Sequence, residues 1–323
     1  MQRLPALALA LALALAALAF GVAAQTGNWP EKPLRVIVPF PPGGPSDIVL
    51  RIAGEAMRGS LRQPVVLENK PGAGGNIGAG EVARAVADGH TWLFATDTVY
   101  TVNPSVYGQL GFKPQDLLPV LVASSFSQTL VCHPRVGVKS LRELIAKARV
   151  EKLDYASGGA GVPGHLAMEL LLDAARVSMQ HIPYKGPAPA TQDVIGGQVG
   201  CGFLAGPTVL PHVRSGRLVA LAVSGAHRSP VLPEVPTVAE AGYPGYDASF
   251  LLVLFAPRAT APAIVAAMNK AMGDALRQPE VADQLKLTDQ SVVAGTPAEA
   301  VAQMELQSRK WAEVVRRIGL KLE

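Results

Sequence analysis

Short β-branched, apolar runs alternate with longer segments of helical spacing along most of the chain. The run Val36–Val38 ends in prolines and glycines, and Ile48, Ile52 and Ala56 then follow at helical spacing. Strands that alternate with helices in this way indicate parallel sheets covered by helices on both faces. The pattern therefore predicts an α/β fold.

Two such series, each of about 100 residues, follow one another. The expected strands are Arg35–Phe40, Val65–Glu68, Thr91–Thr96, Leu153–Ser157, Met179–Tyr184, Val199–Ala205 and Leu218–Val223. The expected helices are Ser46–Met57, one ending near Val86, Ser140–Arg149, Pro163–Ala175, Pro187–Ile195, one near Leu210, Pro262–Leu276, Pro279–Leu287 and Pro297–Arg317. One short helix is also expected within the proline-rich segment Leu232–Tyr246.

Two long apolar segments, Leu117–Pro134 and Ala248–Pro257, flank the second series. Each is a candidate for a strand that crosses from one domain to the other. The prediction is therefore two doubly wound α/β domains joined by crossing strands, with the C-terminal helices returning to the first domain. The expected boundaries are 25–125 plus 247–323 for the discontinuous first domain and 126–246 for the second.

The first 24 residues differ from the rest of the chain. They combine Arg3, a Leu/Ala run and the small residues Val22, Ala23 and Ala24, a pattern typical of a secretory signal peptide cleaved after Ala24. An uncleaved membrane anchor is the alternative, because the run is about long enough to span a bilayer. We expect a mature protein that is soluble and exported.

Composition excludes several classes of protein. The 323 residues carry a net charge of +4 without a cluster of Lys and Arg, so no nucleic-acid partner is expected. Two cysteines are too few for a structural zinc site, and no metal or cofactor is expected. Cys132 and Cys201 form either a disulfide or two buried thiols, and the sequence leaves both open.

Three glycine-rich turns, Pro42–Asp47, Gly72–Gly78 and Gly158–Gly164, join expected strands to expected helices. Ligands of open α/β sheets bind beyond the C-terminal ends of strands, where helix N-termini present unpaired N–H groups and a partial positive charge. Successive glycine amides can also form an anion-binding nest. Because the turns contain no Lys or Arg, main-chain amides and hydroxyls would hold an anion, and we expect binding without catalytic residues.

A nucleotide-dependent enzyme is the competing interpretation. Gly159, Gly161 and Gly164 match G-x-G-x-x-G between a strand and a helix, which is the context of a dinucleotide site. The acidic residue expected about 20 residues later is missing, because Tyr184 and Lys185 stand there. No hydrolase, zinc-protease or Walker motif is present either, so this reading is the weaker one.

Single polar residues near the turns have either a structural role or a role in ligand binding. Asp47, with Ser46, is expected to cap the helix, because a carboxylate accepts the first-turn amides and would repel an anion. Ser157 either donates its hydroxyl to a ligand or is an ordinary strand-end residue. His165 either contacts a ligand or is a packed side chain, and Lys185 is expected at the surface or between the domains.

The chain also carries, in order, the motifs PFPPGGPSD (39–47), ENKPGAGGNIG (68–78), DGHT (88–91), NPSVY (103–107), YASGGAG (155–161), PYKG (183–186), RS (228–229) and LPEVPT (232–237). Together, from about Trp29 to the C-terminus, they resemble the Bug receptors, the substrate-binding proteins of tripartite tricarboxylate transporters. The resemblance implies a periplasmic-binding-protein fold of type II, a two-domain Venus flytrap. It also implies delivery of a small carboxylate or related polar molecule to membrane permease subunits.

The resemblance further implies which loops surround the ligand. The candidate ligand-binding residues are Phe40, Pro42, Gly43, Gly44, Ser46, Asp47, Ala73, Gly74, Gly75, Asn76, Ser157, Gly158, Gly161, Val162, His165, Ala205 and Gly206. The family topology would place the strand of Cys132 beside that of Cys201, which permits a disulfide. A monomer is expected.

Two departures from the family pattern bear on the ligand. Val162 stands where a Ser or Thr is usual, and Leu251 and Val253 replace an aromatic residue and a glycine. Both changes predict a more apolar cleft, and the turns lack cationic side chains. We therefore expect a monocarboxylate, amide or aromatic acid with one apolar end. A receptor for a sensor kinase and a Rossmann-type enzyme remain the alternatives.

Overall fold

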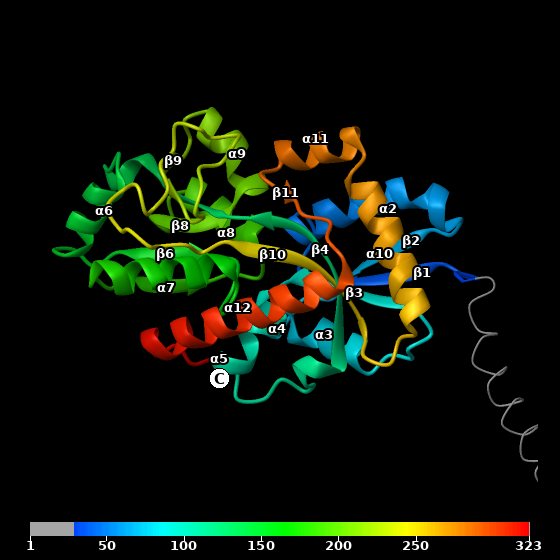
Figure 1. The fold of residues 1–323 in the computed structure, drawn as a ribbon. Coiled ribbons are helices and arrows are strands. Elements are labelled where there is room, and N and C mark those ends of the chain that lie inside the picture. Colours follow the sequence, from blue (N-terminus) through cyan, green and yellow to red (C-terminus); the bar gives the residue numbers. More distant parts are fainter. Residues whose placement is uncertain (1–28, 323) are drawn as a thin grey trace, which may run out of the picture.

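The strands of this protein form two separate sheets. The computed structural model describes residues 29–322. One sheet has the strand order β11-β4-β10-β3-β1-β2, and the other has the order β7-β6-β8-β5-β9. We call the part of the chain built on the first sheet domain 1 and the part built on the second domain 2, and Figure 1 shows them next to each other.

The elements of domain 1 come from both ends of the chain. Its strands are β1 (Leu34–Val38), β2 (Val65–Asn69), β3 (Thr91–Thr96), β4 (Leu117–Phe126), β10 (Phe250–Pro257) and β11 (Ser291–Val292). Its helices are α2 (Pro45–Leu61), α3 (Asn76–Ala83), α4 (Thr98–Thr101), α5 (Asn103–Val106), α10 (Pro262–Leu276), α11 (Pro279–Leu287) and α12 (Pro297–Ile318). Single 3₁₀ turns lie at Ala73–Gly75 (η2) and Pro114–Asp116 (η3).

Domain 2 is formed by the middle of the chain. Its strands are β5 (Gln128–Cys132), β6 (Asp154–Ser157), β7 (Gln180–Pro183), β8 (Cys201–Ala205) and β9 (Val219–Val223). Its helices are α6 (Leu141–Ala148), α7 (Pro163–Ala175), α8 (Pro187–Ile195) and α9 (Gly206–Arg214), with a 3₁₀ turn at Pro134–Val136 (η4).

Both sheets are mixed, whereas the sequence predicted parallel sheets. In domain 1, β1 is parallel to β2 and β3, but β10 is antiparallel to β3 and β4. In domain 2, β6 is parallel to β7 and β8, but β5 is antiparallel to β8 and β9. The antiparallel pairs involve β5 and β10, the strands that enter a sheet directly after a crossing. Each enters its sheet at the end where the parallel strands finish, so it runs in the opposite direction to them.

The two apolar segments form these crossings. Leu117–Pro134 becomes β4 in domain 1 and β5 in domain 2, with Ser127 alone between them. The return follows Ala248, whose N–H donates to the carbonyl of Ser224 at 2.7 Å just before β10 begins. The prediction of two α/β domains joined by crossing strands is therefore confirmed, and the residue boundaries given above stay a prediction.

Proline marks the first turn of the long helices. α7, α8, α10 and α11 begin and end at the predicted residues, and each has proline where a missing N–H leaves no hydrogen bond unmade. α2 begins at Pro45, one residue before the prediction, and runs on to Leu61 because Met57 and Leu61 extend its buried face. α12 starts after Thr296, which forms a capping box with Glu299.

The segment Leu232–Tyr246 forms turns, and the short helix predicted there is wrong. Thr237 and Glu240 bond to each other's backbone as at a helix start, and the N–H of Ala241 donates to the Thr237 carbonyl at 3.0 Å. The turn ends there because Gly242 has a φ of 119°, which no helical residue adopts.

The first 28 residues lie outside the described part of the chain. The signal peptide predicted at residues 1–24 falls among them, so it stays a prediction. Within residues 29–322, every helix is either too short or too polar to cross a membrane.

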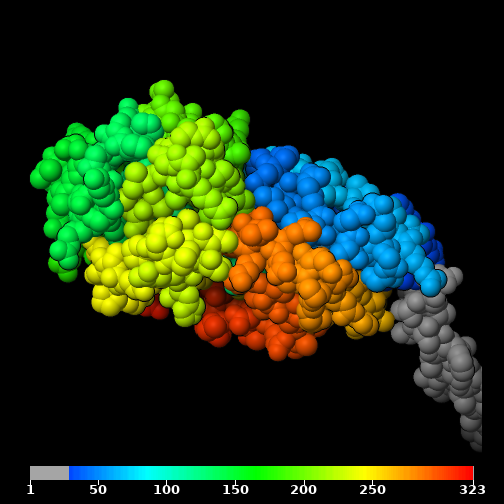
Figure 2. All heavy atoms as spheres, turned by 90° about the horizontal axis from the view of Figure 1, so that it is seen from above, coloured from blue at the N-terminus to red at the C-terminus, as the bar shows by residue number. Residues whose placement is uncertain are grey.

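Helix α12 spans both domains on one side of the molecule. It packs on β4 and α4 of domain 1 and reaches α7 of domain 2 (Figure 1). Near its end, Arg317 pairs with Asp173 of α7 at 3.1 Å. Seen from above, domain 2 in green and yellow abuts both the blue N-terminal part and the orange C-terminal part of domain 1 (Figure 2). The two halves of domain 1 thus share one interface with domain 2.

Candidate ligand-binding site

The first glycine-rich turn leads from β1 into α2. Gly44 is the N-cap of α2, and the Asp47 carboxylate accepts hydrogen bonds from the Gly43 N–H at 3.1 Å and from Arg51 Nε at 3.0 Å. Burial disfavours the charged form of Asp47, but these bonds and one from Asn69 outweigh burial and hold its pKa below the usual value. The prediction that Asp47 and Ser46 cap the first-turn amides is therefore wrong, because the carboxylate fastens the turn instead.

The second turn, Gly72–Asn76, leads into α3. Gly72, Ala73, Gly74 and Gly75 have φ values of 137°, 48°, 62° and 97°, which glycine adopts readily and an alanine rarely does. A Cβ on Gly74 would stand 2.5 Å from Tyr107 Oη. The tight approach of Tyr107 therefore requires glycine at this position.

A side-chain amide holds this second turn from behind. Asn103 Nδ2 donates to the Gly74 carbonyl at 3.1 Å and to Asn76 Oδ1 at 2.6 Å. Both Asn103 and Asn76 are buried. The turn is therefore fixed by neutral groups.

The third turn, Gly158–Gly164, leads from β6 into α7. Gly159 and Gly161 have φ values of 142° and 74°, and Val162 is the N-cap of α7. A Cβ on Gly164 would stand 2.2 Å from the Phe203 carbonyl oxygen, so only glycine allows α7 to begin against β8. The Gly161 N–H donates to His165 Nδ1 at 2.9 Å.

Two stacked imidazoles support this third turn. The rings of His165 and His181 are nearly parallel with their centroids 3.9 Å apart, and His181 Nε2 lies 2.7 Å from Ser157 Oγ. Burial, together with the nearby His181, lowers the pKa of His165 to about 3, and burial lowers the pKa of His181 to about 4. Both rings are therefore neutral near pH 7, which leaves His165 Nδ1 free to accept the Gly161 amide.

The turns of the two domains meet around two adjoining cavities. The inner one has a volume of about 50 Å³, and its lining is Phe40, Gly44, Pro45, Ser46, Thr96, Phe126, Gln128, Gly158, Val162, Pro163, Gly164, Pro187, Phe203, Leu204 and Ala205. The outer one, of about 590 Å³, is lined by the second turn, by Tyr107 and by residues 158–160 and 183–186. Phe40, Gly158 and Val162 border both.

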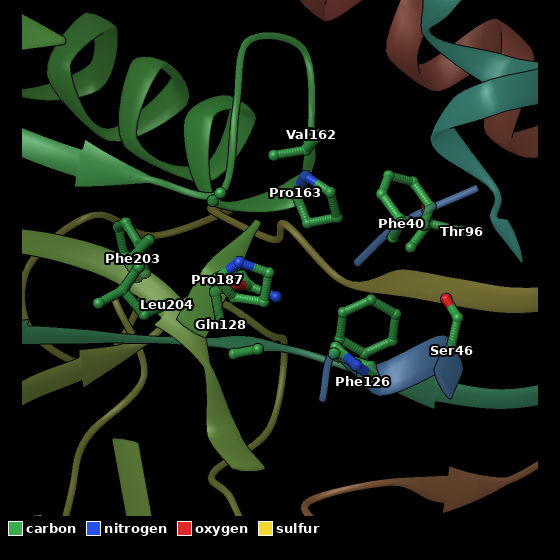
Figure 3. Close-up of a pocket in the computed structure, with 15 residues that line it drawn as sticks. Phe40, Ser46, Thr96, Phe126, Gln128, Val162, Pro163, Pro187, Phe203 and Leu204 are labelled. Carbon is green, nitrogen blue, oxygen red and sulfur yellow. The ribbon is translucent and has the colours of Figure 1, made fainter. Parts of the chain in front are cut away.

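Apolar residues, three phenylalanines among them, form most of the lining of the inner cavity (Figure 3). Phe40 and Ser46 lie on the domain 1 side, Phe203 of β8 lies on the domain 2 side, and the ring of Phe126 lies between them at the end of β4. Every residue in this lining is uncharged. Lys185 is the charged residue in the lining of the outer cavity. The prediction placed Lys185 at the surface or between the domains, and this exposed residue at the cleft mouth meets both descriptions.

The structure brings about half of the predicted ligand-binding residues to the cavities. Those in a lining are Phe40, Gly44, Ser46, Ala73, Gly74, Gly75, Gly158, Val162 and Ala205. Those outside both linings are Pro42, Gly43, Asp47, Asn76, Ser157, Gly161, His165 and Gly206. Several in the second group, such as Asp47 and His165, hold the turns in place.

Other lining residues were not identified from the sequence. Thr96 ends β3 at the same sheet edge as the first turn, so the rule used for the turns would have found it. Gln128 is a polar residue inside a long apolar run. Phe126, Phe203 and Leu204 lie in strands, and no sequence signal separates them from core residues.

The departures at Leu251 and Val253 do not act as predicted. Both side chains are buried in β10 and pack with Ile37, Leu93 and Phe255 in the core of domain 1, away from the cavities. The apolar character of the cleft comes instead from the phenylalanines of the inner cavity and from Val162.

The two cysteines lie directly opposite each other on β5 and β8. Both are buried, and both thiols are free in this structure. The contact with Cys132 and burial raise the pKa of the Cys201 thiol, so it stays protonated. The pair therefore belongs to the core of domain 2.

Comparisons with known proteins agree with this geometry. The family model for the tripartite tricarboxylate transporter family receptor, TctC, matches residues 49–320. BugT of Bordetella pertussis is 37% identical over 309 residues, which cover 94% of this chain and 95% of BugT.

Solved structures give the same result. The periplasmic binding protein BugD has a TM-score of 0.86 at 32% identity, with 91% of this chain and 100% of BugD covered. Rpa4515 of R. palustris with adipate has a TM-score of 0.87 at 31% identity, with 91% and 99% covered. The chain therefore belongs to the TctC/Bug family of periplasmic solute-binding receptors.

Proposed function

We propose that this receptor captures a small carboxylate or amide between its domains and delivers it to the membrane permease subunits of a tripartite tricarboxylate transporter. It would act as a monomer in the periplasm, after export by the signal peptide of residues 1–24, and without catalysing a reaction. The observation that carries the proposal is the meeting of glycine-rich turns from both domains around a cavity with an uncharged lining.

Two helix N-termini from opposite domains would bind the anionic group. The first turns of α2 (Pro45 and Ser46) and of α7 (Pro163 and Gly164) both border the inner cavity. Pro45 and Pro163 have no N–H, so Ser46 and Gly164 would donate at these two N-termini, each of which contributes about 0.3–1 kcal/mol toward an anion. A carboxylate between them would therefore favour contact between the domains.

The inner cavity, at about 50 Å³, would have to widen as the domains separate to admit a ligand, and its lining favours one with an apolar body. Phe40, Phe126 and Phe203 would contact that body, while Ser46 and Gln128 supply the polar side chains. A second carboxylate buried there would lack a cationic partner, which is costly. A diacid such as the adipate of Rpa4515 would have to extend its second carboxylate into the outer cavity, toward Lys185. We therefore propose a monocarboxylate or amide with an apolar end.

The enzyme interpretation is less well supported. The G-x-G-x-x-G turn would need its amides for a pyrophosphate, but the Gly161 N–H is already bonded to His165. A receptor for a sensor kinase would use the same cleft, so only a transport experiment separates it from the proposal. Loss of labelled benzoate uptake on deletion of this receptor would support a role in transport. Unchanged uptake, for a ligand that the receptor binds, would contradict that role.

Ligand binding can be tested with four probes: benzoate, benzamide, adipate and citrate. We expect benzoate or benzamide to stabilise the purified protein by about 2.7 kcal/mol at a hundredfold excess over Kd, as measured by thermal shift and calorimetry. Phe126→Ala should weaken this binding by tenfold or more. The matched control is Phe112→Ala, which changes a ring outside both cavities. Tighter binding of citrate than of benzoate and benzamide would overturn the proposed ligand class.

A further inference from the structure

Asp289 of domain 1 reaches into domain 2. It lies between α11 and β11, and its carboxylate oxygen Oδ1 accepts a hydrogen bond from Ser229 Oγ at 2.6 Å. Ser229 follows β9 and belongs to domain 2. Both residues are buried, with Asp289 only 7% exposed and Ser229 only 3% exposed. This hydrogen bond therefore joins the two domains in a place that water hardly reaches.

The same carboxylate packs on the start of α9. A Cβ on Gly206, the first residue of α9, would stand 2.9 Å from Asp289 Cβ and 3.1 Å from Oδ2. The second carboxylate oxygen, Oδ2, is buried and has no hydrogen-bond donor among the described residues. A negative charge is favourable at this end of a helix. Gly206 thus provides the space that an interdomain carboxylate occupies.

The backbone holds Asp289 in position for this contact. Its φ is 61°, a left-handed conformation that costs energy for a residue with a side chain. The N–H groups of Asp289 and Gln290 donate to the last carbonyls of α11, at Lys286 and Leu285. The turn is therefore rigid, and it directs the carboxylate at domain 2.

We propose that Asp289 is an interdomain latch, whose hydrogen bond to Ser229 and contact with Gly206 favour the closed arrangement of the two domains without any ligand. The latch acts next to the cleft, because Ala205, the neighbour of Gly206, lines the inner cavity. Opening would break the bond to Ser229 and separate the carboxylate from α9. This proposal goes beyond ligand capture, since it concerns the protein by itself.

The test measures domain opening in the ligand-free protein. Hydrogen–deuterium exchange would follow the peptide 204–210, and small-angle X-ray scattering would follow the radius of gyration. Asp289→Gly, which tolerates the same backbone conformation and removes the acceptor, and Ser229→Ala, which removes the donor, should each raise exchange by about tenfold and increase the radius. Arg317→Ala is the matched control, because it removes the exposed interdomain pair with Asp173 and should change neither readout.

Gly206→Ala gives an independent test by steric means. In the wild-type background, the added methyl group should clash with Asp289 and separate the domains. In the Asp289→Gly background it should have no further effect, because the side chain that it contacts has been removed. This non-additivity would identify the contact itself. Wild-type exchange and scattering in Asp289→Gly and Ser229→Ala, or additive effects in the double variant, would overturn the latch. Because no ligand is used, this outcome is independent of the proposed function.

Discussion

The turn Gly72–Asn76 in domain 1 and the turn Gly158–Gly164 in domain 2 border the same outer cavity, yet different groups hold them. Asn103 fixes the first through bonds to its backbone and to Asn76. His165, stacked on His181, fixes the second. Asparagine does not titrate, whereas imidazole does, so the comparison teaches that acid should act on one wall of the cleft and spare the other.

The largest expected effect is a loss of stability in acid that originates in domain 2. Burial holds the pKa of His165 at about 3 and that of His181 at about 4 in the folded protein, against about 6.5 when unfolded. Below pH 6.5 the unfolded chain therefore takes up protons that the folded one does not. The free energy of unfolding is therefore highest above pH 6.5. It should fall by roughly 3–5 kcal/mol as the pH is lowered to 4.5, as measured by urea unfolding.

Substitution of the pair should remove most of this pH dependence. His165→Asn keeps an acceptor for the Gly161 amide, and His181→Phe keeps the stacked ring. The double variant should show a flatter pH profile, while His227→Asn, at an exposed position, should keep the wild-type profile. An unchanged profile in the double variant would mean that carboxylates elsewhere cause the acid sensitivity.

The second effect concerns the glycine turn of domain 1. Gly74→Ala places a Cβ 2.5 Å from Tyr107 Oη and at a φ of 62°, so we expect a loss of about 1–3 kcal/mol in stability and weaker benzoate binding. Gly59→Ala is the control, because Gly59 lies in α2 with open space around it and alanine there should stabilise by up to ~1 kcal/mol. Chemical unfolding measures the stability of each variant, and calorimetry measures its benzoate binding. Equal results for the two variants would contradict the tight fit at Gly74.

A smaller effect is expected at Tyr107, which lies between the two turns. Tyr107 packs on Gly74 of one turn, and its Oη donates to the Ala160 carbonyl of the other turn at 3.3 Å. Tyr107→Phe removes this bond and keeps the ring, so closure should weaken by about 0.5–1.5 kcal/mol. A two- to tenfold rise in the dissociation constant for benzoate would follow. An unchanged constant would mean that this bond contributes nothing to closure.

The smallest effect concerns Lys185. This side chain is exposed at the outer cavity, so its removal should weaken the binding free energy of an anionic ligand by at most about 1 kcal/mol. In Lys185→Ala, calorimetry should show weaker adipate binding and unchanged benzoate binding. Weaker binding of both would place the first carboxylate in the outer cavity and revise the proposed orientation.

The sequence was most informative where local chemistry decides structure. Prolines in first turns predicted the residues at which α7 and α10 begin, and glycines predicted the turns that meet at the cleft. Phe126 and Phe203 were missed because a strand residue lines a cleft or a core according to how two domains meet, which no local pattern encodes. The role of Asp47 was misjudged for another reason: a carboxylate at a helix start can accept from first-turn amides or from neighbours such as Gly43 and Arg51, and the residue type does not tell which.

Strand β10 lies inside the six-stranded sheet, between β3 and β4, although its residues come from the last quarter of the chain. During synthesis, β3 and β4 therefore wait with open edges, and such edges invite pairing with other chains. Domain 2 is complete once β9 and the turns after it have been made, whereas domain 1 needs nearly the whole chain. A ribosome that stalls before Phe250 would release one finished domain joined to an unfinished one that tends to aggregate. Successful production of this protein thus depends on protecting the edges of β3 and β4 until β10 (Phe250–Pro257) has been made.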